Sequence, residues 1–428
     1  TVFVLDHDGA ISTYDVSGAV GDEPSGDEVD AERVEFSAEV RWRGAAAREA
    51  MFDHVVRQVA AKFYEPKLHG ADWAGLAAHY RRFLPHVADN AAFTELLSEL
   101  LGELNASHTG AYRRRKLPDA EATASLGLLF DPRRREDGLL VTEVLAGGPA
   151  DRAGSRLAPG MVLTHVNGVE LAARAPLEPL LDRRDGKKVV VRARPADGGA
   201  PFEEVVKAVA RGEERELLYR RWLRGREALV DRLSGGRVAY VHVRDMDDAG
   251  FRRVYQDALG KGGAKDALVV DTRYNGGGWL HDHLIAFLDA REYLWFVPRG
   301  KARGDLGTEP GFRWARPAAV VVNEDDYSDA HVFPFAVQAL KLAPIVGARV
   351  AGTGTAVWWE TLIDPEVLFG IPQVGLQGAD GRYLENQELV PDVEVPSDPE
   401  SAARGDDPQL EAAVRLLLET VEKRPRPK

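Results

Sequence analysis

A single serine, Ser328, stands between a predicted buried strand and a predicted helix. The apolar run that ends at Val322 is typical of a strand covered on both faces, and helical spacing starts near Ala330. A hydroxyl at such a junction lies near the free N–H groups and the positive end of the helix, which suits a nucleophile whose product is an oxyanion. Helix capping by Ser328 or Asp329 is the commoner role, so this segment alone favours capping.

Three consecutive glycines, Gly276, Gly277 and Gly278, follow another apolar strand that ends at Asp271. Glycines allow the backbone to approach a ligand closely. No Lys-Ser/Thr pair follows them, so a phosphate-binding P-loop is excluded. Their N–H groups could instead face a tetrahedral intermediate, and a plain strand-to-helix turn is the alternative.

Histidines supply the candidate bases. His108 follows a predicted helix and stands beside Ser107. A lone histidine is more often a packed or surface residue, and His331, three residues after the serine, is a second candidate. His281 and His283 could suggest a metal pair, but alternate positions on a helix point to different faces, so we expect both at the surface. Glu385, taken alone, reads as an exposed glutamate.

Composition limits the class of protein. The chain has 428 residues, too many for one ordinary core, and a net charge of -13, which disfavours nucleic acid as a partner. It has no cysteine, so disulfides and cysteine nucleophiles are excluded. No apolar run reaches the length of a membrane span. The chain opens at Thr1 with a hairpin pattern that lacks a partner, which predicts a fragment or a processed product.

The pattern along the chain divides it into four segments. Residues 1–33 read as a leftover hairpin and an acidic linker, and residues 34–124 as a small helical domain. The helical domain is predicted to hold helices over 45–64, 73–83 and 91–104, the last with Asn90 as its N-cap. Residues 125–211 are rich in short strands and turns. Residues 212–428 alternate strands with helices, which predicts parallel pairing in an α/β core.

The segment 125–211 resembles a PDZ domain, a small β module. Its SLGLLFD run, a GGPADRAG segment and Pro-Gly and Asn-Gly turns carry the resemblance. In that family the first run offers backbone N–H groups to the carboxylate of a peptide terminus, and the next strand pairs with the peptide. The resemblance assigns the groove to the following residues: Leu126, Gly127, Leu128 and Leu129.

Four motifs in order, LLGELNASHTG, DTRYNGGG, NEDDYSDA and LENQELVPDVEV, resemble the S41 serine peptidase family. With the PDZ-like segment between the first two, they look most like its tricorn branch. The resemblance implies an α/β multidomain fold: a small helical domain, a PDZ-like β domain and an α/β (ClpP/crotonase-like) catalytic core. The β-propellers that this branch carries upstream are absent, although residues 1–16 could be a leftover pair of propeller strands.

The resemblance assigns a role to each matched position. Ser328 corresponds to the nucleophile, His108 to the general base, Ser107 to the hydroxyl that supports the imidazole, and Glu385 to the carboxylate that orients it. The backbone N–H groups of the oxyanion hole fall on two residues: Gly278 and Asp329. The substrate-binding positions are Gly276, Gly277, Tyr327 and Phe296.

Two positions depart from the family pattern. Tyr327 stands where the family often has glycine, and it would narrow the turn and wall the pocket. Phe296 stands where the family has an acidic residue that selects basic P1 side chains, which predicts an apolar P1 preference.

The predicted function is therefore that of a serine endopeptidase or oligopeptide-processing peptidase. Its substrates are peptides or unfolded proteins, and it needs no metal or cofactor. The resemblance also implies a homo-oligomer, and a chain terminus could bind in the PDZ groove. We expect a cytoplasmic location, with a periplasmic or secreted one left open by a lost signal peptide. The alternative is a carrier or PDZ scaffold of the same fold without catalysis.

Overall fold

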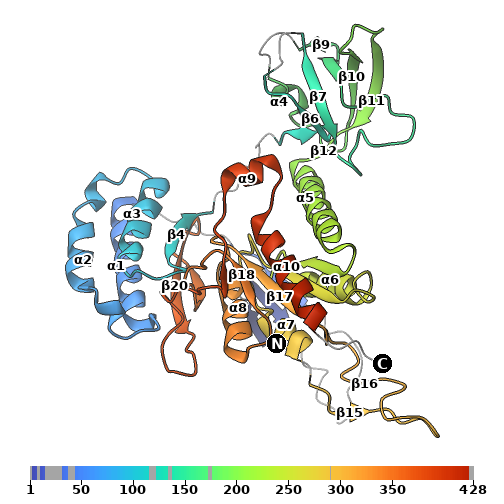
Figure 1. Cartoon of the computed structure of the whole chain (residues 1–428). Helices are drawn as coiled ribbons and strands as arrows, with labels where there is room; N and C mark the ends of the chain where they lie inside the picture. Colours follow the sequence, from blue (N-terminus) through green and yellow to red (C-terminus); the bar gives the residue numbers. More distant parts are fainter. Residues whose placement is uncertain are drawn as a thin grey trace.

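The computed structural model describes residues 2–6, 10–14, 31–36, 44–114, 122–133, 137–171, 176–289 and 291–423. They form a helical unit, an antiparallel β unit and a central α/β core, which Figure 1 shows at the left, the top and the middle. The predicted mixed α/β class is confirmed. In the described part of the chain, no helix is both long and apolar enough to cross a membrane.

The central core is a parallel sheet of five strands. In spatial order these are β13 (Val238–His242), β14 (Ala267–Asp271), β17 (Ala318–Val322), β18 (Ile345–Gly347) and β21 (Val393–Glu394). Every residue of the first four strands is buried, as continuous Val and Ala runs predict for a sheet covered on both faces.

Helices cover both faces of this sheet. One face packs against α6 (Asp248–Leu259), α7 (His281–Asp289) and α8 (Asp329–Leu340). The other packs against α5 (Arg211–Ser234) and α10 (Pro408–Lys423). A short helix, α9 (Pro399–Arg404), precedes α10. Because β14 and β17 are parallel neighbours, the loops after their carboxyl ends meet at one edge of the sheet.

The helical unit holds α1 (Gly44–Lys62), α2 (Trp73–Arg81) and α3 (Asn90–Gly102), with two 3₁₀ turns, Leu68–Gly70 and Leu84–His86. The predicted N-cap of α3 was wrong. Asp89, not Asn90, caps this helix, since its carboxylate accepts from the N–H groups of Ala91 at 2.9 Å and Ala92 at 3.0 Å. Asp89 has the extended backbone that a cap needs, whereas Asn90 is already helical.

The helices do not form a core by themselves. They pack on a three-stranded sheet, β19 (Thr355–Thr361), β20 (Val367–Gly375) and β4 (Gly110–Arg113). Phe52 and Leu97 of the helices share a core with Phe369 and Ile371 of β20. The helical unit, predicted as residues 34–124, therefore also includes the strands β19 and β20, which lie more than 200 residues further along the chain. These two strands belong to the segment 212–428, which was predicted as the α/β core.

The antiparallel β unit spans residues 124–210. Its main sheet has the order β11 (Phe202–Lys207), β10 (Lys188–Pro195), β8 (Met161–Val166), β7 (Leu139–Val144), β6 (Leu128–Phe130), and β9 (Val169–Glu170) pairs with β8. The first and last strands of this unit, β5 (Ala124–Ser125) and β12 (Val209–Ala210), pair with each other in a separate two-stranded sheet. One small helix, α4 (Glu178–Leu181), lies beside the sheet, and α5 leads from this unit into the α/β core (Figure 1).

Two smaller sheets complete the fold. The N-terminal pair β1 (Val2–Leu5) and β2 (Ile11–Tyr14) has a partner, β3 (Ala31–Val34), although the sequence predicted a hairpin without one. The third strand comes from the end of the predicted linker, whose residues 15–30 lie outside the described part. A second hairpin, β15 (Leu294–Trp295) and β16 (Thr308–Glu309), projects from the α/β core at the lower right of Figure 1.

Candidate active site

Ser328 occupies a sharp turn between β17 and α8. Its backbone has φ 59° and ψ −120°, a strained conformation for a residue with a side chain. The Thr353 hydroxyl holds this turn, since it accepts from the Ser328 N–H at 2.7 Å. The Ser328 side chain makes no capping hydrogen bond to α8. The capping interpretation therefore fails for this serine, and its hydroxyl is left for another role.

The glycine run packs directly against this turn. A Cβ atom on Gly277 would lie 2.6 Å from the Cβ atom of Ser328 and 3.0 Å from the backbone nitrogen of Asp329, so only glycine fits. Gly277 and Gly278 have φ of 96° and 143°, which glycine adopts without strain. In the described part of the chain, the N–H groups of Gly278 and Asp329 have no protein acceptor. Two free donors thus lie on the segments that meet at Ser328.

His108 lies in the loop between α3 and β4, against the residue that precedes Ser328. Its backbone N–H donates to the Tyr327 hydroxyl at 2.7 Å, and the two rings have centroids 4.8 Å apart. This contact places the loop of His108 beside the serine turn. Among the described residues, no hydrogen bond joins the Ser328 hydroxyl to the imidazole. Such bonds are often long in unliganded enzymes and form with substrate.

Two hydroxyls surround the Nδ1 atom of His108, that of Ser107 at 2.8 Å and that of Thr355 at 3.0 Å. The Ser107 hydroxyl donates its only proton to Glu385 at 2.9 Å. Its oxygen can then accept from Nδ1–H, an arrangement that leaves Nε2 unprotonated in the neutral ring. The bond from Ser107 to Glu385 thus favours the tautomer that a general base requires.

Glu385 lies beneath this network with 4% of its surface exposed. It also accepts from the backbone N–H of Ser107 at 2.5 Å. Burial raises the pKa of Glu385, and the hydrogen bonds from Ser107 oppose that rise. The sequence alone suggested an exposed glutamate, but the loop after β20 folds over Ser107 and buries the carboxylate.

The two candidate bases have different surroundings. Burial lowers the pKa of His108 below its usual value of 6.5 and keeps the ring neutral near pH 7. His331 is 1% exposed, and burial lowers its pKa to about 4. Its Nδ1 atom accepts from the Thr353 N–H at 3.3 Å, so this histidine supports the loop that holds Ser328. These contacts favour His108 as the base.

The Asp329 carboxylate has a structural role that is separate from the free backbone N–H group of this residue. One carboxylate oxygen accepts from the N–H groups of Leu280 at 2.6 Å and His281 at 3.1 Å, at the start of α7. The other lies 2.5 Å from His281 Nδ1 and raises the pKa of that histidine. His281 is therefore not the free surface residue expected from the sequence. The carboxylate ties α7 and the glycine run to the serine turn.

Sequence reasoning missed two threonines. Thr353 holds the backbone of Ser328, and Thr355 contacts the imidazole of His108 and the Ser107 hydroxyl. A Thr-Gly-Thr segment in the loop that follows β18 is the signal that could have drawn attention to them.

Phe296 is not brought to this site. It lies at the β15–β16 hairpin, where its N–H donates to Gly307 at 3.1 Å and 39% of its surface is exposed. No contact joins it to Ser328, His108 or Tyr327 in the described part of the chain. Its predicted role in P1 selection stays a prediction.

The predicted peptide groove lies between β6 and α4 and has a volume of about 260 Å³. Leu126 and Leu128 face the core, with 2% and 5% exposed. The Gly127 N–H, expected to face a terminal carboxylate, donates to the Ser125 hydroxyl at 3.0 Å, and that hydroxyl donates to Glu214 of α5 at 2.6 Å. A carboxylate of this chain thus already lies at the loop, and capture of a foreign terminus stays a prediction.

A strained serine at a strand-to-helix turn, with two free N–H donors and an oriented histidine nearby, defines the class of serine-type hydrolases. Two family models match the chain: "Peptidase family S41" over residues 237–395 and "Tricorn protease C1 domain" over residues 45–102. The chain belongs to peptidase family S41 and, within it, to the tricorn type.

Curated relatives agree with this assignment. The chain is 33% identical over 422 residues to "Tricorn protease homolog 1" and 32% identical over 418 residues to "Putative tricorn protease homolog 2", both of Streptomyces coelicolor. Each match covers 95% of this chain but only 38% and 35% of the relative. The chain thus spans little more than a third of the length of these relatives.

A solved structure has the same fold. The crystal structure of the tricorn protease superposes with a TM-score of 0.79, at 20% identity, over 98% of this chain and 40% of that chain. At this identity the likeness shows the fold, and the chemistry has to be argued from the residues of this chain.

Proposed function

We propose that this protein is a serine endopeptidase or oligopeptide-processing peptidase that forms an acyl-enzyme at Ser328. The observation that carries the proposal is the chain of contacts from Glu385 through Ser107 to His108, held beside the serine turn by Tyr327. Together with Ser328 as the nucleophile, these contacts supply His108 as the base, the Ser107 hydroxyl that holds the base and the Glu385 carboxylate that holds the hydroxyl.

In the acylation step, the Ser328 oxygen attacks the peptide carbonyl carbon while Nε2 of His108 takes the hydroxyl proton. The carbonyl oxygen becomes an oxyanion, which the N–H groups of Gly278 and Asp329 stabilise. One such donor is typically worth about 3 to 4 kcal/mol of the barrier. The C–N bond then breaks, and Nε2–H gives its proton to the leaving amine. Water repeats the sequence on the ester and releases the acid.

The hydroxyl of Ser107 takes the place that a carboxylate has in many triads. It accepts from Nδ1–H, so the imidazolium formed during acylation is stabilised through Ser107 by the buried Glu385 charge. Thr355 offers a second oxygen at the same atom. Gly277 lies directly against the serine turn and Gly276 borders open space, so we propose that the substrate backbone passes beside Ser328 along these two glycines.

The family resemblance supports further proposals. We propose peptide or unfolded-protein substrates, an apolar P1 preference set by Phe296, assembly into a homo-oligomer, a chain terminus bound between β6 and α4, and a cytoplasmic location. Apart from the peptide bond of the substrate, none of these properties enters the chemical steps above.

A fluorophosphonate probe tests the proposal. Near pH 8, we expect stoichiometric labelling of the wild-type chain, with the phosphonate on the peptide that contains Ser328. Heat-unfolded protein is the control, because an unactivated serine does not react. A folded chain that stays unlabelled would favour the carrier or PDZ-scaffold alternative.

The pH profile follows from the position of His108. The base must be neutral to accept a proton, and burial lowers its pKa below 6.5. Activity should therefore rise with pH through a midpoint below 6.5 and be complete near pH 7. Measurement of kcat/KM for a fluorogenic peptide from about pH 4.5 to 8 gives this midpoint. A midpoint clearly above 7 would contradict the assignment of a desolvated histidine as the base.

Replacement of Tyr327 by phenylalanine should slow catalysis without weakening binding. The change keeps the ring against His108 but removes the oxygen that accepts its backbone N–H. The hydrogen bond lies at an exposed position, since 37% of the Tyr327 surface is exposed, so its loss costs about 0.5 to 1.5 kcal/mol and kcat should fall about 2- to 13-fold with little change in KM. Steady-state kinetics measure this split. Tyr112→Phe, which removes an exposed hydroxyl on β4, is the control and should leave both constants unchanged.

A further inference from the structure

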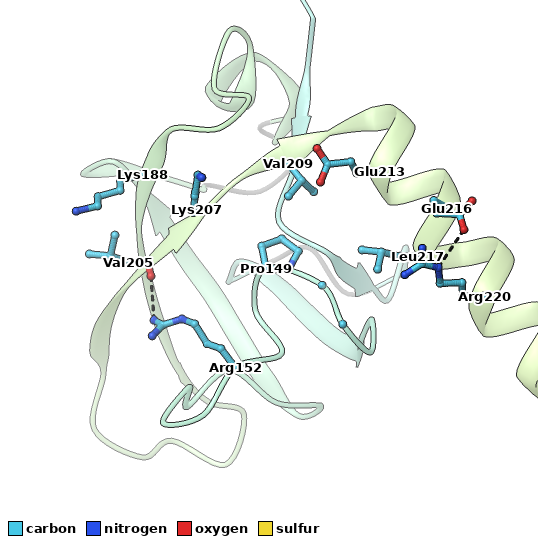
Figure 2. A pocket seen from close by; sticks show the side chains of 12 residues that line it. Pro149, Arg152, Lys188, Val205, Lys207, Val209, Glu213, Glu216, Leu217 and Arg220 are labelled. Atoms are coloured by element: carbon cyan, nitrogen blue, oxygen red, sulfur yellow. Dashed lines mark hydrogen bonds and ion pairs between the residues drawn. The ribbon is translucent and has the colours of Figure 1, made fainter.

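A pocket of about 510 Å³ lies away from the serine turn, between the antiparallel β unit and the start of α5. Figure 2 shows Lys188, Lys207 and Val205 on one side of it, Leu217 on the other and Pro149 between them. It is also separate from the groove between β6 and α4, with which it shares no lining residue. The mechanism proposed above does not use it.

The two lysines form an unusual pair. Lys188 of β10 and Lys207 of β11 are direct partners across the two strands, and both side chains are exposed. Like charges directly opposite each other are unfavourable. Two steps along the same face, Val190 is opposite Val205, and two steps further Arg192 is opposite Glu203, the usual complementary arrangement. Neither lysine has an ion-pair partner among the described residues.

The spacing of this pair suits one carboxylate. Side chains opposite each other on antiparallel strands have Cβ atoms about 5 Å apart. A carboxylate that accepts from two ammonium groups at about 2.8 Å each holds them at a similar separation. A single carboxylate placed between the two lysines would therefore turn a repulsive pair into an attractive set of three charges.

The surface next to the lysines is apolar. Val205, 45% exposed, lines the pocket together with Pro149 and Leu217, of which Leu217 is 8% exposed. Val190, 40% exposed, is the strand partner of Val205 and is not a lining residue. The Gly148 loop comes close to Leu217, since a Cβ atom on Gly148 would lie 3.1 Å from its Cδ1 atom. A ligand whose carboxylate binds the two lysines would thus bring its neighbouring apolar groups into contact with these apolar side chains.

The other charges of the pocket select the kind of anion. Arg152 is engaged by Glu204 and the Val205 carbonyl, and Arg220 by Glu216. Glu213 also lines the pocket, in a chain of net charge -13. Polyanions such as phosphate chains or nucleic acid are therefore repelled, and one carboxylate is favoured.

The backbone of the pocket distinguishes a side chain from a terminus. Terminal carboxylates are usually captured by free backbone N–H groups. Here the N–H of Gly147 donates to the Asp151 carboxylate at 2.7 Å, and that of Gly148 to the Leu145 carbonyl at 2.9 Å. The flexible lysine side chains remain as the donors, and they suit a carboxylate that a side chain presents.

We propose that this pocket binds an acidic–apolar peptide segment, with an Asp or Glu side chain between Lys188 and Lys207 and apolar side chains on Val205, Pro149 and Leu217. Because α5 forms one wall, such a segment would contact both the β unit and the first helix of the α/β core.

Calorimetry with capped peptides tests this site. The full chain carries Ser328→Ala, so no peptide is cleaved and failure of the catalytic proposal does not affect the result. We expect acetyl-Asp-Leu-Val-amide to bind at least tenfold more tightly than acetyl-Asn-Leu-Val-amide. Equal affinities would overturn the proposal.

Lysine variants locate the binding. K188Q/K207Q should reduce the affinity for the Asp peptide to that for the Asn peptide, whereas K187Q, which removes the same charge outside the pocket, should not. Thermal unfolding should show K188Q/K207Q to be at least as stable as the parent, since the variant removes a like-charge pair. Full affinity in K188Q/K207Q would place the site elsewhere and overturn the proposal. So would equally tight binding of acetyl-Asn-Leu-Val with a free terminal carboxylate.

Discussion

Replacement of Ser328 by alanine should abolish peptide hydrolysis, with kcat reduced by about 10⁶-fold and KM nearly unchanged. Loss of a nucleophile in a serine peptidase has an effect of this size, and the residual rate comes from binding and the oxyanion donors. The Ser328 hydroxyl makes no capping bond, so its removal does not weaken α8. Hydrolysis of a fluorogenic peptide and fluorophosphonate labelling measure the loss.

Ser397→Ala provides a matched control. Ser397 is an exposed serine that precedes α9. Its hydroxyl donates at 2.8 Å to Glu324, a residue of the loop between β17 and the serine turn. It should keep full activity and full labelling. If Ser328→Ala kept more than a tenth of the wild-type rate with an unchanged melting temperature, the nucleophile would have to be another residue.

The His108→Ala substitution should lower kcat by about 10⁵- to 10⁶-fold, because the hydroxyl of Ser328 then has no group to take its proton. The effect should not add to that of Ser328→Ala, since the two residues act as one unit. The double variant should therefore be no slower than either single variant. Steady-state kinetics of the three variants give this comparison.

The same series separates His108 from the other histidine near the turn. His331 is buried and holds Thr353, so His331→Ala should lower the melting temperature as well as the rate. His108→Ala should leave the melting temperature nearly unchanged. A loss of less than tenfold for His108→Ala would mean that another group is the base.

The sequence predicted the elements that follow simple periodic rules. The strands that end at Asp271 and Val322 are continuous apolar runs, and the structure buries both in a parallel sheet. Their adjacency brings the glycine run and Ser328 to one edge. The helices α6 and α10 form where apolar residues repeat at helical spacing.

Long-range pairings could not be read from these patterns. Strand β4 pairs with β20, for example Ala111 with Phe369, and no local signal specifies which distant segment a four-residue strand will join. This pairing positions the loop of His108. The contacts of Thr355 and Glu385 depend on the same packing. The role of Glu385 was therefore predicted only from the family resemblance, and Thr355 was missed.

The peptide groove shows a similar limit. The resemblance to a PDZ domain assigned the groove to the segment Leu126–Leu129, but α5 begins more than 80 residues later. Its Glu214 carboxylate reaches the Ser125 hydroxyl at the loop. Propensity and periodicity describe single elements, whereas such a contact depends on how two units pack.

The central claim is that His108 and Ser328 act on the same carbonyl. A crystal structure of the chain treated with a peptide chloromethyl ketone tests it most directly. We expect one inhibitor molecule bonded to both Ser328 Oγ and His108 Nε2, with its hemiketal oxygen about 3 Å from the N–H groups of Gly278 and Asp329. An inhibitor bonded to another histidine, or a hemiketal oxygen that faces away from these two donors, would contradict the account.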